Sequence, residues 1–326
     1  MTGNPHQLPD ASSPTVSVMH RNFFAAVPES WDDFLRTAEV IDEAGIDRVV
    51  MSDHVVMGDH LDEYAKPEAG GIAGGRQPTG PDGVWLDPLA TLAVIAGRTR
   101  RVRLATAILL AALRRPAVLA KHLATLDSLS GGRLDIGVGI GWQREEYEAA
   151  GLDYRSRGRL LDHSLDVVTT LWRDTPASFA DDRLAFDGIY LVPKPAQAGG
   201  VPIWVSGRVN DRVLDRIVRF GAGWIPWGDD AADPGPGVRR IREALASVGR
   251  DPSTLGVVGA LRVERDDDSR VDVARTMAPV ESMAANGITD FRLQMSIPSS
   301  HERALDELSM LADAFRARVG GKPTGR

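Results

Sequence analysis

Short apolar segments alternate with amphipathic segments along almost the whole chain. The apolar segments have the length of strands and are predicted at residues 15–19, 46–52, 102–110, 133–140, 201–206, 222–227, 255–264 and 289–295. Each is followed by a segment with helical spacing, as Leu161, Leu165 and Val168 illustrate. A crossover helix returns the chain in the same direction, so the strands should be parallel. Eight such units favour the α/β class and a closed (β/α)8 TIM barrel over an open doubly wound sheet.

Two insertions interrupt this alternation. After the second strand, residues 58–83 are rich in Gly and Pro, too irregular for a regular element and too long for an ordinary connection. The segment 55–86 is therefore predicted to be a functional loop or lid. Residues 179–195 have the pattern of a small hairpin inserted before the fifth strand. We expect one barrel domain over 15–318, with a flexible N-terminal segment, 1–14, and a C-terminal tail, 319–326.

The composition narrows the classes of function. The 326 residues carry a net charge of −7 with acids and bases interspersed, whereas a general nucleic-acid binder would show a basic face. There is no cysteine, which excludes a disulfide framework, a thiolate metal site and a cysteine nucleophile. No apolar run has the length of a membrane span, and the N-terminus lacks an apolar signal core. We expect a cytoplasmic protein with neither a nucleic acid nor a membrane as partner.

In a barrel of this kind the site lies at the carboxyl ends of the strands. The second strand ends at Asp53 and His54, where a histidine can exchange a proton near neutral pH and the acid can orient a neighbour. The alternative interpretation is a histidine packed against the rim. Asp59 and His60 follow, but no metal-binding spacing accompanies them, so no metal site is predicted.

The ends of the fourth, fifth and sixth strands are rich in glycine. Gly137, Gly139 and Gly141 are followed by Trp142, which does not fit the dinucleotide fingerprint G-x-G-x-x-G. Ser206, Gly207 and Arg208 precede a helix and form a candidate phosphate cradle of free backbone N–H groups, a hydroxyl and a guanidinium; an ordinary turn with a surface arginine is the alternative. The tryptophans at this rim either line an apolar pocket or pack in the core, and they are Trp85, Trp142 and Trp227.

Three stretches of the chain carry a family resemblance. They are GIDRVVMSDHVVM, SGGRLDIGVGIGWQREEYEAAG and VPIWVSGRVNDRVLDRIVRFGAGWIPW. Together with the segments between them, they resemble the luciferase-like monooxygenase superfamily, and more closely its branch of coenzyme F420-dependent oxidoreductases. The likeness runs from about residue 15 to residue 318, with the motifs in the same order.

The resemblance implies a flavin or deazaflavin ring at the mouth of the barrel. It implies that Asp53 and His54 are the catalytic pair, with His54 near the reactive ring, and that a cis peptide bond between Ala107 and Ile108 supports the face of the ring. It further implies that Gly139, Gly141 and Trp142 close on the ring, the glycines allowing the backbone to approach it. The phosphate would be held by the ends of the fifth and sixth strands, at Ser206, Gly207, Arg208, Pro226, Trp227 and Gly228.

The function expected from this resemblance is hydride transfer between coenzyme F420 and a small organic substrate. One departure is that the sugar-phosphate dehydrogenase relatives have a glutamate where this chain has Trp142, although Glu145 and Glu146 lie close by.

Three arginines either bind the acidic tail of the deazaflavin or are ordinary surface charges: Arg76, Arg114 and Arg115. The alternatives are a monooxygenase dependent on reduced FMN, a flavin-binding protein without turnover and, last, a metal hydrolase. We expect a homodimer.

Overall fold

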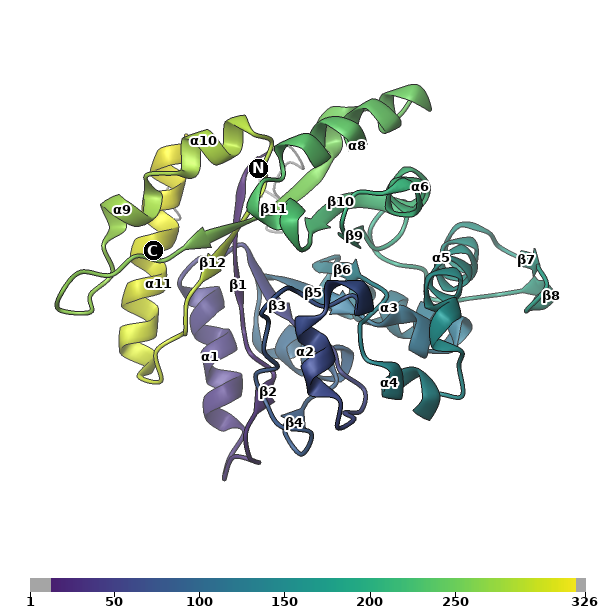
Figure 1. Ribbon diagram of the computed structural model, residues 1–326, viewed down its shortest axis with the longest axis horizontal. Coiled ribbons are helices and arrows are strands. Elements are labelled where there is room, and N and C mark those ends of the chain that lie inside the picture. Colours follow the sequence, from purple (N-terminus) through teal and green to yellow (C-terminus); the bar gives the residue numbers. More distant parts are fainter. Residues whose placement is uncertain (1–12, 321–326) are drawn as a thin grey trace, which may run out of the picture.

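The computed structural model describes residues 13–320, and within them eight parallel strands close into a barrel (Figure 1). The strands adjoin in the order β1-β12-β11-β10-β9-β6-β5-β3, and β3 pairs again with β1. Their bounds are β1 Thr15–Met19, β3 Arg48–Met51, β5 Arg103–Leu109, β6 Leu134–Val138, β9 Ile203–Gly207, β10 Gly221–Pro226, β11 Gly256–Arg262 and β12 Asp290–Gln294. The predicted (β/α)8 barrel is confirmed. The predicted terminal segments lie largely outside the described residues.

Helices cover the outside of the barrel. Those that follow the strands are α1 Asp32–Glu43, α2 Pro88–Arg98, α3 Pro116–Ser130, α4 Arg144–Ala149, α5 Arg157–Arg173, α6 Asp211–Phe220, α7 Asp229–Ala232, α8 Gly235–Ser247, α9 Val273–Met277, α10 Val280–Ala285 and α11 His301–Val319. Asp87 and Asn210 cap α2 and α6 with side-chain oxygens, as their position predicts. The single helix predicted near 272–286 is instead two short ones, because Pro279 lacks the N–H that a continuous helix needs.

The insertion after β3 is more regular than the sequence predicts. It contains the 3₁₀ turns η1 Leu61–Ala65 and η2 Pro67–Ala69, and it ends in β4 Val84–Trp85, which pairs antiparallel with β2 Phe23–Phe24. Phe23 stacks on Trp85 with ring centroids 4.5 Å apart, and this aromatic contact is the reason why so short a pair of strands forms. The prediction of a wholly irregular loop is therefore wrong.

The second insertion is a hairpin, as predicted, but it occupies an earlier part of the range. Its strands are β7 Ala177–Ala180 and β8 Ala185–Ile189. The residues after it run along α3 instead, where Lys121 donates to the carbonyl of Val192 and the Ser128 hydroxyl donates to the carbonyl of Lys194. The hairpin projects from the side of the molecule at α5 (Figure 1).

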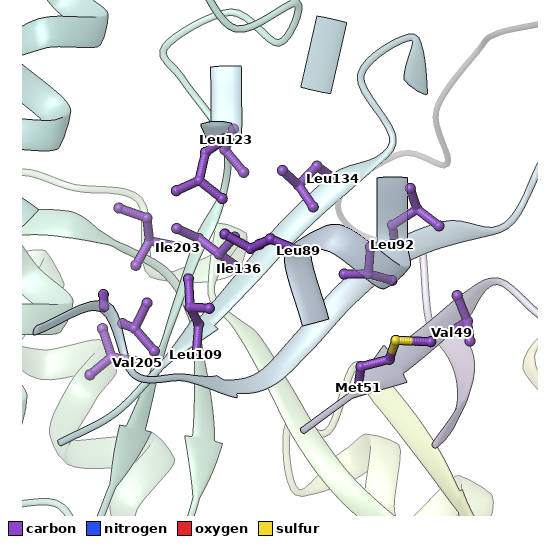
Figure 2. Close-up of a cluster of buried hydrophobic side chains, with 14 of the residues drawn as sticks. Val49, Met51, Leu89, Leu92, Leu109, Leu123, Leu134, Ile136, Ile203 and Val205 are labelled. Atoms are coloured by element: carbon purple, nitrogen blue, oxygen red, sulfur yellow. The ribbon is translucent and has the colours of Figure 1, made fainter. Parts of the chain in front are cut away.

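The apolar core lies between the strands and the surrounding helices. Figure 2 shows part of it, where strand residues such as Leu109, Ile136 and Val205 gather with Leu89 and Leu123 from the helices. Each of these five side chains is buried. Successive side chains of a strand point to opposite faces of the sheet, so the strand residues between these outward-facing ones point into the barrel.

The inside of the barrel is ionic near the amino ends of the strands. Arg48 on β3 contacts Asp135 on β6, with Nε and Oδ2 3.0 Å apart, and it also pairs with Asp290 on β12. Arg103 on β5 reaches the same Asp135 oxygen at 2.7 Å. Neither β6 nor β12 adjoins β3, so these side chains meet across the interior. Sequence patterns did not predict this network, because it depends on which strands face each other after closure.

Candidate active site

His54 lies three residues beyond the end of β3, between two tryptophans. Its side chain is 11% exposed. The imidazole stands edge-on to Trp85, with centroids 4.6 Å apart, and to Trp142 at 6.0 Å. Both rings come from outside β3, so the predicted site residue is enclosed by aromatic walls.

A buried glutamate lies behind the histidine. Glu146 Oε2 is 3.3 Å from His54 Nδ1, and the glutamate side chain is fully buried. Its other oxygen accepts a hydrogen bond from the backbone N–H of Val55 at 2.8 Å. Within the described residues, neither His54 Nδ1 nor Glu146 Oε2 has a hydrogen-bond partner of good geometry. The two groups form a dyad in which the carboxylate can stabilise an imidazolium.

Glu146 is the functional candidate that sequence reasoning left without a role. Its signal was the pair Glu145 and Glu146 directly after the glycine-rich strand end. The structure separates the two: α4 buries Glu146 against His54, whereas Glu145 lies outside and pairs with His60, with Oε1 and Nδ1 2.5 Å apart. Only the direction of α4 decides which acid reaches the histidine.

Asp53, which the resemblance pairs with His54 as catalytic, binds the segment after β5 in the structure. Its Oδ2 accepts from the backbone N–H of Leu110 at 2.8 Å and from Arg114 at 2.6 Å, and its Oδ1 accepts from the same guanidinium at 3.1 Å. These bonds tie the end of β3 to the segment after β5, so Asp53 positions the strand ends. The carboxylate beside His54 belongs to Glu146.

Of the three arginines proposed to bind the acidic tail of the deazaflavin, some are free to bind a ligand and one is not. Arg114 is bound to Asp53 and to Asp87, the latter at 2.7 Å, so it is not free for a ligand. Arg76 and Arg115 are exposed, and no ion pair involves either of them among residues 13–320. They remain candidates.

The peptide bond between Ala107 and Ile108 is cis, as the resemblance implies. The pairing of β5 with β6 shifts register between Thr106 and Leu109, which is the pattern of a bulge. Both residues at the bulge are only partly buried. They therefore present backbone and small apolar surface to the mouth of the barrel.

The glycines of β6 serve packing between strands. A Cβ on Gly137 would lie 2.2 Å from the carbonyl oxygen of Thr106, and one on Gly139 would lie 2.7 Å from Ile108 Cδ1. At Gly141, which has a φ of 66°, a Cβ would meet Leu110 at 2.7 Å. The space is already filled by β5 and its extension. These glycines therefore let β6 approach the bulge, and their expected role at a cofactor stays a prediction.

The segment predicted as a lid lies on strand-end tryptophans. Trp227 Nε1 donates to the carbonyls of Gly70 and Gly71, both at 3.2 Å. The ring of Tyr64 lies 5.4 Å from that of Trp142 and 6.5 Å from that of Trp227. Further along, Gln77 Nε2 lies 3.1 Å from His54 Nε2. The insertion thus contacts the histidine and two of the predicted binding residues.

The predicted phosphate cradle is only partly open. The backbone N–H of Val209 donates to Asp230 at 2.6 Å, and the N–H groups of Arg212 and Val213 donate to the cap Asn210. Side chains of the protein therefore already satisfy three of the backbone donors that were expected to be free at this helix start.

Two side chains at the end of β9, those of Arg208 and Ser206, remain available to bind a phosphate. Arg208 is 41% exposed, and its nearest carboxylate is Asp229 at 4.0 Å. Gly228, with a φ of 61°, leaves room for it, since a Cβ there would lie 2.5 Å from Arg208 Nε. The Ser206 hydroxyl makes no hydrogen bond within the described part of the chain. Pro226 ends β10 beside Gly207. A phosphate would be held by the Arg208 and Ser206 side chains.

The site fits a flat ring that bears a phosphate better than it fits a metal ion. The buried His54 and Glu146 atoms without hydrogen-bond partners suit proton transfer to a ligand. The bulge at Ala107 and Ile108 and the walls of Trp85 and Trp142 suit an apolar ring. Among residues 13–320 no group of three or more His, Asp or Glu side chains could hold a metal ion. No helix in that range is long and apolar enough to cross a bilayer.

Comparison with known proteins gives an independent view of this barrel. A family model described as luciferase-like monooxygenase matches residues 13–313. An uncharacterised protein of Mycobacterium tuberculosis is 34% identical over 166 residues, which are 51% of this chain and 58% of that protein; the match thus spans little more than half of the relative. The F420-dependent glucose-6-phosphate dehydrogenase of Amycolatopsis mediterranei is 27% identical over 300 residues, covering 89% of this chain and 81% of that enzyme.

Solved structures share the fold. An F420-dependent secondary alcohol dehydrogenase, solved with an F420-acetone adduct, superposes with a TM-score of 0.71 at 19% identity, over 93% of this chain and 99% of that one. A riboflavin lyase, solved with modified FMN and riboflavin, superposes with a TM-score of 0.74 at 15% identity, over 95% and 93%. At these identities the likeness shows the barrel fold alone.

Proposed function

Because the chain belongs to the luciferase-like monooxygenase family, we propose that it is an oxidoreductase that transfers a hydride between coenzyme F420 and a small organic substrate. The observation that carries this proposal is the buried dyad of His54 and Glu146, with Nδ1 and Oε2 3.3 Å apart. The relative aligned over 89% of this chain is F420-dependent, which favours the deazaflavin.

The dyad would move the proton that accompanies the hydride. When bound, coenzyme F420 supplies two-electron hydride chemistry. Oxidation of an alcohol also releases the hydroxyl proton, which His54 Nε2 would accept. Nδ1 faces the buried carboxylate of Glu146, which stabilises the imidazolium once the proton arrives. In the reverse direction the same nitrogen returns the proton to the carbonyl oxygen.

Other residues would bind the coenzyme and exclude water. The bulge at Ala107 and Ile108 supports the ring, and Arg208 with Ser206 holds the phosphate. Gln77 lies at His54 Nε2, so a substrate hydroxyl must displace its amide. The lid therefore has to shift when substrate binds and can then close over it.

The runner-up is a monooxygenase dependent on reduced FMN on the same barrel. A neighbour of the same fold was solved with modified FMN, and the ring and phosphate positions of FMN and F420 would overlap. A flavin-binding protein without turnover is less favoured, because it has no need of a buried proton-transfer dyad.

We expect His54→Ala to abolish turnover while it leaves affinity for F420 within about threefold of the parent value. Loss of a general acid-base group lowers rates by roughly 10² to 10⁴. The assay follows F420 absorbance with a panel of small primary and secondary alcohols and, in reverse, their carbonyl products. A parallel loss of rate and coenzyme affinity would contradict the proton-transfer role.

Glu146→Gln is expected to lower turnover by roughly tenfold to a hundredfold and to change its pH profile, since the imidazolium loses its carboxylate partner. Glu145→Gln is the matched control. It removes a neighbouring acid that pairs with His60, and it should leave the rate within about twofold. Equal effects of the two substitutions would exclude a special role for Glu146.

A further inference from the structure

The charges inside the barrel do not balance. Arg292 stands on β12 between Phe291 and Leu293, which are buried on the outer side, where Phe291 packs on Phe315 of α11. Its own side chain therefore points into the barrel. There it joins Arg48, Arg103, Asp135 and Asp290. Three guanidinium groups thus face two carboxylates.

The two carboxylates are fully used by the other arginines. Asp135 binds Arg48 and Arg103, and Asp290 binds Arg48 and the Ser17 hydroxyl. Arg292 makes one contact, from Nε to Ser17 Oγ at 3.5 Å, and no carboxylate contacts it among residues 13–320. Burial, followed by the nearby charge of Arg48, lowers the pKa of Arg292 to about 9. A guanidinium that the barrel largely encloses and that has no counter-ion is unfavourable.

The guanidinium of Arg292 is nonetheless reachable from the mouth. The residue is only partly buried. Ala260, its partner on β11, is exposed although it lies within a barrel strand and faces inward. One step higher on the same two strands, Arg262 and Gln294 are exposed as well. Solvent therefore reaches the inward-facing residues of β11 and β12 from Arg262 and Gln294 to Ala260 and Arg292. The nearest acid at the rim, Glu264, is already shared by Arg262 and Arg275.

We propose that Arg292 binds an oxyanion group of the substrate, a carboxylate or a phosphate, and thereby selects small anionic substrates. A planar guanidinium binds such groups with two parallel hydrogen bonds. The inference rests on the proposed function for the site where the other end of the substrate reacts. It is distinct from the coenzyme clamp, because Arg208 directly follows β9, and two strands, β10 and β11, lie between β9 and β12 in the barrel order.

The test compares Arg292→Met with Arg262→Met, a rim arginine whose side chain is 80% exposed. The probes are sodium sulfate and sodium acetate, each titrated against sodium chloride at equal ionic strength, with the thermal midpoint as readout. The thermal midpoint of the parent should rise saturably with sulfate, acetate or both. A stronger response to sulfate indicates that the site takes a phosphate-like group, and a stronger response to acetate indicates a carboxylate. Arg262→Met should keep the apparent Kd within about twofold.

Arg292→Met should raise the thermal midpoint measured without oxyanion and weaken the response of the midpoint to oxyanion. Without oxyanion its midpoint should lie above that of the parent, because an unpaired charge that the barrel largely encloses has been replaced by an apolar group. Its saturable response should weaken by roughly tenfold or more. A lower midpoint with an unchanged response would show a purely structural cation and overturn the proposal. If Arg292→Met does not fold, Arg292→Lys decides: it should retain a weakened oxyanion response, and an undiminished response would overturn the proposal.

Coenzyme binding separates this inference from the proposed function. Quenching of Trp fluorescence by F420 should give the same Kd for the parent and for Arg292→Met, within about twofold. Joint loss of F420 and sulfate binding would mean that Arg292 holds the coenzyme, and would overturn the substrate assignment. Failure of F420 to bind the parent, with the sulfate response intact, would contradict the proposed function and leave the oxyanion site standing.

Discussion

At the scale of single residues, the strand-end histidines show how burial decides chemistry. His20 follows β1 and His54 follows β3, but His20 is turned outward onto α1, where its ring stacks on Phe34 at 4.2 Å and Nε2 lies 2.9 Å from the Phe34 carbonyl oxygen. Burial lowers its pKa to about 4. His20 is therefore neutral at physiological pH and donates one hydrogen bond, which makes it a structural residue.

This burial predicts a pH dependence of stability. The pKa of His20 is about 4 in the folded protein against its ordinary value of 6.5, so its contribution is complete above about pH 6.5 and declines as the pH falls toward about 4. At about pH 5 the loss should be about 2 kcal/mol. His20→Gln, which keeps a donor without a titrating ring, should lose less. Urea unfolding of both proteins at several pH values measures the difference, and parallel curves would contradict the assignment.

At this scale, the sequence predicted a site residue only where its position at the end of a strand was enough to locate it. His54 and Arg208 follow β3 and β9, as their positions in the sequence predict, whereas the bulge at Ala107 and Ile108 lies within β5 and was implied only by the resemblance. Asp53 also follows a strand, but its carboxylate is bound by Leu110 and Arg114, and Glu146 takes the place beside the histidine. Such contacts depend on how loops and short helices fold back, which spacing along the chain does not specify.

At the scale of elements, the close packing of β6 on β5 shapes the candidate site, and the glycines of β6 allow the two strands to pack so closely. We expect Gly137→Ala to lower the free energy of unfolding by about 3 kcal/mol, because the new Cβ would lie 2.2 Å from a backbone oxygen of β5. Gly97→Ala in α2 is the control. No atom lies within 4 Å of its Cβ position, so it should add about 0.5 to 1 kcal/mol. Equal small effects in denaturant titrations would refute the packing role.

Most elements could be predicted because each strand and helix has its own apolar pattern. The exceptions have tertiary causes. Strands β2 and β4 are two residues each and exist through the contact of Phe23 with Trp85, which lie 62 residues apart in sequence. The charged interior was also beyond prediction, because Arg48 and Asp290 become neighbours only when the barrel closes. Patterns along the chain do not contain such pairings.

At the scale of the whole molecule, a homodimer is the expected assembly. Large apolar side chains are exposed at the end of β8, in the segment that follows it and on α3: Ile189, Tyr190, Val192 and Val118. Lys121 of α3 binds the carbonyl of Val192, so the two segments are adjacent. We predict that Tyr190→Asp shifts a dimer toward monomer in light scattering, whereas Val248→Asp, at the end of α8, does not. A parent that is monomeric would contradict this prediction.

The most direct test of the proposed function is a side-by-side titration of the purified protein with coenzyme F420 and with FMN, followed by quenching of Trp fluorescence. Trp85 and Trp142 flank His54, so a ring bound at the mouth should quench them. We predict saturable binding of F420 at least about tenfold tighter than that of FMN. Tighter binding of FMN, or binding of neither, would contradict the assignment of this barrel as an F420-dependent oxidoreductase.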